Sequence, residues 1–192
     1  AVHAENGDMM FFIAGPEKTA ATAMGQLRLE IARIKGLLDP NRREFVWITE
    51  FPMFEYSETE GRYMAMHHPF TSPMPEHLEM MLSGNLKDCK AQAYDLVLNG
   101  VEIGGGSIRI HNPEVQEKVF RLLGLTEEQV QEKFGFFVDA FKFGAPPHGG
   151  LAFGLDRIVA TMEGQESIRD FIAFPKNTSA SSPMDQSPSE VD

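Results

Sequence analysis

The sequence is short of cysteine, of positive charge and of long apolar runs, and each shortage excludes a class of protein. Its single cysteine, Cys89, can form neither an internal disulfide nor a cysteine cluster for zinc, so we expect a cytoplasmic protein. Lysine and arginine number 17 against 28 acidic residues, and the formal net charge of −11 disfavours nonspecific attraction to nucleic acid. No run approaches the roughly 18 consecutive apolar residues of a membrane-spanning helix, so we expect no membrane contact.

The composition that remains is that of a globular protein, with 42% hydrophobic and 23% charged residues. A length of 192 residues suffices for one domain with a core, or for one domain and a piece of another. The chain opens on Ala1 without a charged and apolar leader, and a strand-like run follows over 9–14. We therefore expect this chain to be a part of a longer protein.

Apolar spacing and turn residues divide the chain into helices and strands. An apolar stripe at steps of four and three predicts a helix over 20–38. Asn112 and Thr126 are typical caps for two further helices. Strands that come in hairpins, followed by separate helices, predict an α+β fold with an antiparallel sheet. The remaining expected elements are strands over 45–51, 62–66, 90–98, 101–110, 151–153 and 171–174, and short helices over 75–82 and 155–162.

Two carboxylates face each other across the most clearly marked hairpin. Asn-Gly at 99–100 favours a two-residue type I′ turn, and this turn places Asp95 opposite Gly104. Alternation along the strands then puts Asp95 and Glu102 on one face as diagonal neighbours, roughly 7–8 Å apart. Such a pair suits Mg²⁺ that carries phosphates. Solvated strand residues are the alternative that the spacing leaves open.

Three consecutive glycines follow Glu102, and glycine weakens a strand unless something needs the space. Either a ligand lies against the backbone there, or the strand bulges. Glu102 and Arg109 are seven residues apart, so a regular strand would put them on opposite faces. One bulge between Gly104 and Ser107 would bring Arg109 to the face of Glu102, where its guanidinium group could bind a carboxylate. A surface arginine at a flexible strand end is the alternative.

Two more segments carry polar side chains at the ends of expected elements. His67 and His68 precede Pro69, and a polar contact to a small substrate fits them better than zinc, since no other histidine or cysteine clusters nearby. In the second segment, 150–157, a short strand turns at a glycine into a helix whose first turn holds Arg157. A helix start with an arginine favours phosphate. Ordinary core or surface packing is the alternative for both.

Together these segments resemble one family. GLAFGLDR at 150–157 resembles the third signature motif of class II aminoacyl-tRNA synthetases. Within that class, HHPFTSP at 67–73, AYD at 93–95 and EIGGGSIRIH at 102–111 resemble the bacterial-type aspartyl enzymes, and the likeness runs over 45–176. The preceding segment resembles the end of their insertion domain. The family's first two motifs and its anticodon-binding domain are absent from this chain.

The resemblance implies a role for each matching residue. Arg157 and Glu102 would act in catalysis on ATP, and Asp95 with Glu102 would hold Mg²⁺. Arg109 would clamp the side-chain carboxylate of aspartate, and His67, with His68 beside it, would contact the same substrate. The residues expected to bind ATP are Glu102, Gly154, Leu155, Asp156 and Arg157.

The resemblance also implies a fold, a function and partners. We expect an incomplete class II sheet with flanking helices over 40–177, the end of an inserted α+β domain over 1–39 and a loosely ordered tail over 178–192. The parent protein would be a homodimer that activates L-aspartate with ATP and transfers it to tRNA, and this chain alone would be inactive. The alternatives are an asparaginyl or lysyl enzyme, an ATP-dependent amino-acid ligase, or a fragment that only binds a partner.

Overall fold

The structure is a computed structural model that describes residues 3–189, and it divides into two compact units, Ala1–Arg42 and Arg43–Asp192. The first unit contains helix α1, Glu17–Ile34. This helix ends four residues before the expected position because Gly36 adopts a positive φ of 61° and donates its N–H to the Arg33 carbonyl. The strand expected over 9–14 is wrong, since the structure has no strand there and a strand needs a partner to hydrogen-bond.

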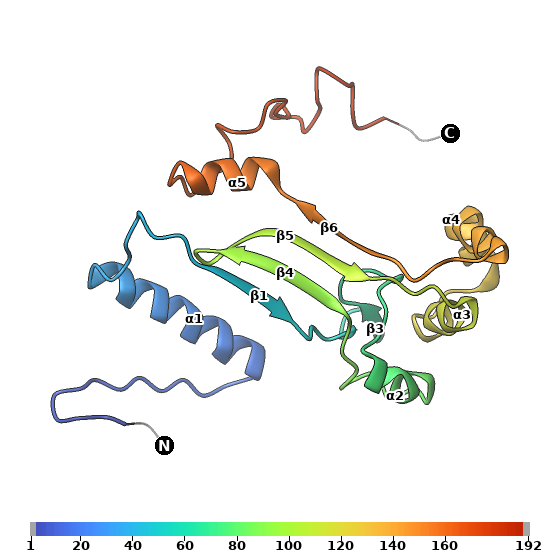
Figure 1. The fold of residues 1–192 in the computed structure, drawn as a ribbon, viewed down its shortest axis with the longest axis horizontal. Coiled ribbons are helices and arrows are strands. Elements are labelled where there is room, and N and C mark those ends of the chain that lie inside the picture. Colours follow the sequence, from blue (N-terminus) through green and yellow to red (C-terminus); the bar gives the residue numbers. More distant parts are fainter. Residues whose placement is uncertain (1–2, 190–192) are drawn as a thin grey trace. The chain divides into compact units, whose positions relative to one another are not determined.

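The second unit is built on an antiparallel sheet with the strand order β1-β4-β5-β6 (Figure 1). A separate two-stranded hairpin pairs β2 with β3. The α+β fold class with an antiparallel sheet is therefore confirmed, although the sequence analysis missed β2. The strands are β1 Phe45–Thr49, β2 Phe54–Ser57, β3 Arg62–Ala65, β4 Ala93–Leu98, β5 Val101–Ile108 and β6 Gly149–Phe153.

The β4–β5 hairpin has the expected turn but a different register. Asn99 and Gly100 have φ values of 49° and 84°, as a type I′ turn requires. The ladder shifts next to the turn, because Glu102 pairs with Val97 whereas Gly104 pairs with Leu96. One residue of β5 is therefore extra at this point. The bulge lies before Gly104, so the position expected between Gly104 and Ser107 is wrong, and so is the pairing of Asp95 with Gly104.

Helices begin where polar caps satisfy their first N–H groups. The Asn112 side chain accepts from the N–H groups of Glu114 and Val115, and Thr126 forms the expected capping box with Gln129. Figure 1 shows α3 and α4 at the end of the sheet where β5 finishes, whereas α5 follows β6. The helices of this unit are η1 Pro75–His77, α2 Leu78–Leu82, α3 Pro113–Leu122, α4 Glu127–Ala140, η2 Phe141–Phe143 and α5 Leu155–Met162.

The core of the second unit gathers side chains from α2, α3, the β2–β3 hairpin and one end of the sheet. Met81 and Val119 are fully buried there, together with Cys89. Burial raises the pKa of the Cys89 thiol to about 11, so this cysteine is an unreactive core side chain. Phe70 adds a second group of packed rings, because its ring contacts Phe120 of α3 and two phenylalanine rings of α4.

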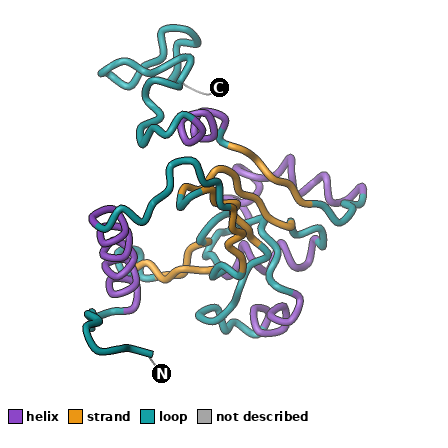
Figure 2. The backbone as a smooth tube through the Cα atoms, turned by 60° about the vertical axis from the view of Figure 1, so that its left-hand side comes forward, coloured by secondary structure: helices purple, strands orange, loops and turns teal. Residues whose placement is uncertain are grey.

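The chain after α5 forms loops and turns over 163–189 (Figure 2). The strand expected over 171–174 is therefore wrong, since no neighbouring strand pairs with this segment. The expected identity of 1–39 as an inserted domain and the loose order of the tail stay predictions, and 190–192 lie outside the described residues. No helix within residues 3–189 is long and apolar enough to cross a membrane.

Candidate functional site

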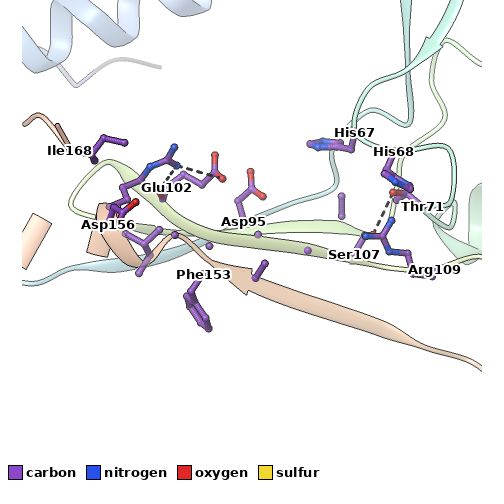
Figure 3. Close-up of a pocket in the computed structure, with 18 residues that line it drawn as sticks. His67, His68, Thr71, Asp95, Glu102, Ser107, Arg109, Phe153, Asp156 and Ile168 are labelled. Carbon is purple, nitrogen blue, oxygen red and sulfur yellow. Dashed lines mark hydrogen bonds and ion pairs between the residues drawn. The ribbon is translucent and has the colours of Figure 1, made fainter. Parts of the chain in front are cut away.

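A cavity of about 570 Å³ lies on one face of the sheet. Strands β4, β5 and β6 form its floor, and the segment after β3 and the start of α5 line its sides. Figure 3 shows its polar side chains spread along the sheet, with Glu102 and Asp156 at one end and Arg109 at the other. The cavity brings together the following residues expected from the sequence: His67, His68, Asp95, Glu102, Arg109, Gly154, Asp156 and Arg157.

The bulge in β5 explains why Glu102 and Arg109 reach the same cavity. The one extra residue before Gly104 reverses the alternation of side chains, so that residues seven apart share a face. Asp95 pairs with Gly105 and lies between the two ends (Figure 3). A Cβ atom on Gly105 would lie 2.4 Å from the Asp95 carboxylate. Glycine at this position therefore leaves the space that the Asp95 side chain occupies.

Arg157 and Glu102 form the first end of the cavity. Arg157 Nη1 donates to the Glu102 backbone carbonyl over 2.7 Å and lies 3.7 Å from the carboxylate oxygen Oε1. Both side chains remain about half exposed, at 45% and 53%, so this ion pair contributes little stability. The backbone bond fixes the guanidinium group beside the N-terminus of α5, whose free N–H groups favour a negative ligand. This end of the cavity suits phosphate.

Arg109, His67 and His68 form the second end. The Arg109 backbone is fixed by its N–H bond to the His148 carbonyl, at 2.9 Å. His68 Nδ1 accepts from the Phe70 N–H over 3.2 Å, so the remaining ring nitrogen, Nε2, carries the proton of the neutral imidazole. Burial lowers the pKa of His68, and the positive charge of Arg109 lowers it further. This end therefore presents the Arg109 cation and the Nε2–H donor of His68, which suit a carboxylate.

The profile of the family described as "tRNA synthetases class II (D, K and N)" matches residues 15–178 of the chain. The chain belongs to this family. It shares 54% identity over 188 residues with the aspartate–tRNA ligase of Staphylococcus carnosus, and the alignment covers 98% of this chain and 32% of that protein. It also shares 54% identity over 192 residues with the aspartate–tRNA(Asp/Asn) ligase of Lachnoclostridium phytofermentans, over 100% of this chain and 32% of the relative.

The class II chain thus spans about a third of the length of the curated relatives that it matches. Among solved structures, the aspartyl-tRNA synthetase of Entamoeba histolytica aligns with a TM-score of 0.53 at 22% identity. That alignment covers 90% of this chain and 29% of the other, and it supports the class II fold.

Several cavity residues of this class II chain were missed by the sequence analysis. Thr71 and Ser107 line the cavity and are buried, and Ile168, in the loop after α5, also lines it. The alternation of side chains along β5 could have identified Ser107, because it lies two residues from Arg109 and therefore on the same face. No local sequence pattern marks Ile168. Leu155 is not brought to the cavity: it is absent from the lining and 72% exposed. Its expected contact with ATP stays a prediction.

A metal ion in the cavity would need ligands beyond the side chains of the described residues. No group of three or more histidine, cysteine or acidic side chains within residues 3–189 could enclose a metal ion. Asp95 and Glu102 nevertheless place two carboxylates in one cavity. Mg²⁺ is usually bound through one or two carboxylates together with substrate phosphates and water, so the two residues fit Mg²⁺ better than a metal held by protein alone.

Proposed function

We propose that this chain is part of an aspartate–tRNA ligase that activates L-aspartate with ATP and transfers it to tRNA. The proposal depends on how the charged side chains are separated in the cavity: Arg109 lies at one end, and Arg157 with Glu102 lies at the other. Two substrates bound side by side, an amino acid with a side-chain carboxylate at the Arg109 end and ATP with its triphosphate at the Arg157 end, match this arrangement. The names of the relatives, which are 54% identical, support aspartate as that substrate.

The reaction has two steps. In the first, an α-carboxylate oxygen of aspartate bonds to the α-phosphorus of ATP, the bond to the β-phosphate bridging oxygen breaks, and pyrophosphate leaves. In the second, a hydroxyl group of the terminal adenosine of tRNA attacks the carbonyl carbon of the adenylate, and AMP leaves. Neither step needs a covalent enzyme nucleophile, so the protein contributes mainly position and charge.

Different residues of the cavity bind the different parts of the two substrates. Arg157 binds the triphosphate, with Gly154 and Asp156 shaping the pocket around the nucleotide. Asp95 and Glu102 hold Mg²⁺, which neutralises phosphate charge when it is bound. Arg109 binds the side-chain carboxylate of aspartate through a charge-assisted contact.

Arg109 also distinguishes the rival substrates within the family. A lysine substrate would bring its ammonium group close to the guanidinium group of Arg109, which is partly buried, and like charges disfavour this contact. A ligase for another acidic amino acid remains compatible with Arg109 alone. The names of the relatives favour aspartate over such a substrate.

The partners follow from the family rather than from the cavity. Membership of the class II synthetases supports tRNA as the acceptor, a homodimer as the working assembly and the cytoplasm as the place of action. The relatives named as ligases for tRNA(Asp/Asn) make asparagine tRNA a second possible acceptor. These partners concern the whole protein, of which this chain would supply the cavity described above.

The proposal is tested by aspartate-dependent exchange of labelled pyrophosphate into ATP, with the complete protein. We expect exchange in the natural protein. The Arg109→Leu variant should lose it while ATP binding stays nearly unchanged, since a hydrogen bond to a charged group contributes roughly 1.5–3 kcal/mol. Arg157→Ala should instead weaken ATP binding. Exchange supported by another amino acid but not by aspartate, or an unchanged KM for aspartate in Arg109→Leu, would refute the proposal.

A further inference from the structure

Two buried hydroxyl groups lie side by side in the wall of the cavity at its Arg109 end. Thr71 is 2% exposed and Ser107 is 4% exposed, and Thr71 Oγ1 donates to Ser107 Oγ over 3.4 Å (Figure 3). Burying a hydroxyl group costs free energy that its hydrogen bonds only partly return. Ala93, the partner of Ser107 on β4, is equally buried, so a small apolar side chain fits this layer of the sheet. Packing alone does not explain the hydroxyl pair.

The two hydroxyl groups carry two protons, but the hydrogen bond between them uses only one. Each hydroxyl group carries one proton, and the pair forms one hydrogen bond between its side chains. Neither side chain has a further hydrogen-bond partner among the described residues. Because Thr71 donates, the remaining proton belongs to Ser107. Ser107 precedes Arg109 by two positions and shares its face of the sheet, so this proton is available at the carboxylate-binding end.

We propose that Ser107 donates this proton in a hydrogen bond to the side-chain carboxylate of bound aspartate, beside Arg109. Thr71 supports this hydrogen bond because its own hydroxyl group donates to the Ser107 oxygen, so that the Ser107 proton is left for the substrate. The inference rests on the proposed function, and it makes Ser107 a specificity-determining residue of the same cavity.

The chemistry of this end of the cavity selects a carboxylate over a carboxamide. The Arg109 guanidinium group has only donors, the Ser107 hydroxyl donates, and the neutral His68 ring carries its proton on Nε2 because Nδ1 already accepts. A carboxylate accepts on both oxygens and satisfies these donors. The carboxamide of asparagine would bring two N–H protons to the same donors. The pair therefore contributes to the preference for aspartate over asparagine.

The test compares Ser107→Ala with Thr71→Val in the complete protein by pyrophosphate exchange. Ser107→Ala should raise the KM for aspartate about tenfold or more, since it removes a donor to a charged group, and leave the KM for ATP within about twofold. The ratio of kcat/KM for aspartate to that for asparagine should fall. Thr71→Val keeps the Ser107 hydroxyl group, so the rise in the KM for aspartate should be smaller, about threefold.

Ser182→Ala is the matched control, because Ser182 is also buried, at 6% exposure, but does not line the cavity. This variant should leave both KM values unchanged. The inference is overturned if Ser107→Ala keeps the KM for aspartate within about twofold of the natural protein. It is also overturned if the KM values for aspartate and ATP rise together as Tm falls, which would indicate a structural role. Absence of aspartate-dependent exchange in the natural protein would instead refute the proposed function.

Discussion

At the residue scale, partial burial beside Arg109 lowers the pKa of the cavity residue His68. Burial is the main cause of the lowered pKa of His68, and the charge of Arg109 adds to it. Below about pH 6.5, His68 binds a proton in the unfolded chain. In the folded protein His68 binds this proton only at a lower pH, because its pKa is lowered there. Stability from this residue is complete above pH 6.5 and decreases as the pH falls toward the folded pKa.

Removal of the cation should raise the pKa of His68. In Arg109→Leu we expect the pKa to move toward its ordinary value but to stay below it, because burial, the larger cause, remains. NMR titration of labelled histidine in the natural protein and the variant measures this change. Arg121→Leu is the control: this exposed arginine pairs with Glu117 on α3, and its loss should leave the titration unchanged. An identical pKa for His68 in Arg109→Leu would contradict the contact.

At the element scale, the close approach of β5 and β6 positions the end of the cavity that holds Arg157. Strand β6 leads directly into α5 and Arg157, and it pairs with β5 from Gly104 to Ile108. A Cβ atom on Gly106 would lie 1.8 Å from the Gly150 carbonyl oxygen. Glycine at this position is therefore required for pairing with β6, rather than for a ligand that lies against the backbone.

Gly106→Ala should separate β6 from β5 and displace Arg157 from Glu102. We expect a loss of about 3 kcal/mol or more in the free energy of unfolding, as for other severe backbone clashes, together with weaker ATP binding. Gly150→Ala is a matched control on the facing strand, since a Cβ atom there has no neighbour within 4 Å. It should change the free energy by less than about 1 kcal/mol. Denaturation in urea measures both, and equal effects of the two substitutions would contradict the argument.

At the scale of the whole chain, the sheet has an open edge and much exposed apolar surface. Strand β1 is an edge strand, and Phe45 and Trp47 on it are 60% and 52% exposed. Phe153 on β6 is 55% exposed. Exposed edges and apolar patches of this kind favour association. Among the described residues that line the cavity, the arginines are Arg109 and Arg157, one toward each end, and Asp95 lies between them (Figure 3).

The purified 192-residue chain should therefore associate with itself and show no aspartate-dependent exchange. Catalysis needs alignment to about 1 Å, and within residues 3–189 the cavity lining has no arginine or lysine besides Arg109 and Arg157. Trp47→Lys should reduce the association measured by analytical ultracentrifugation. Phe136→Lys, at a residue 81% exposed on α4 and away from the edge, serves as the comparison. A monomeric chain with measurable exchange above an Arg157→Ala control would contradict both expectations.

The sequence by itself determined the features that depend on neighbouring residues. The turn at Asn99 and Gly100, the caps at Asn112 and Thr126 and the start of α5 follow from backbone preferences and side-chain hydrogen bonds within a few positions. The motif spacing likewise indicated a shared site, and the same residues line one cavity apart from Leu155.

Tertiary structure decided the features that depend on distant partners. The bulge lies next to the turn, before Gly104, which is the first residue of β5 that pairs with β6, whereas sequence parity alone placed it between Gly104 and Ser107. Segment 171–174 has strand-like residues but no neighbour to pair with, so it forms no strand. The contact between Thr71 and Ser107 joins residues 36 positions apart. Only the folding of the segment after β3 onto β5 brings those two hydroxyl groups together, which is why no local pattern revealed them.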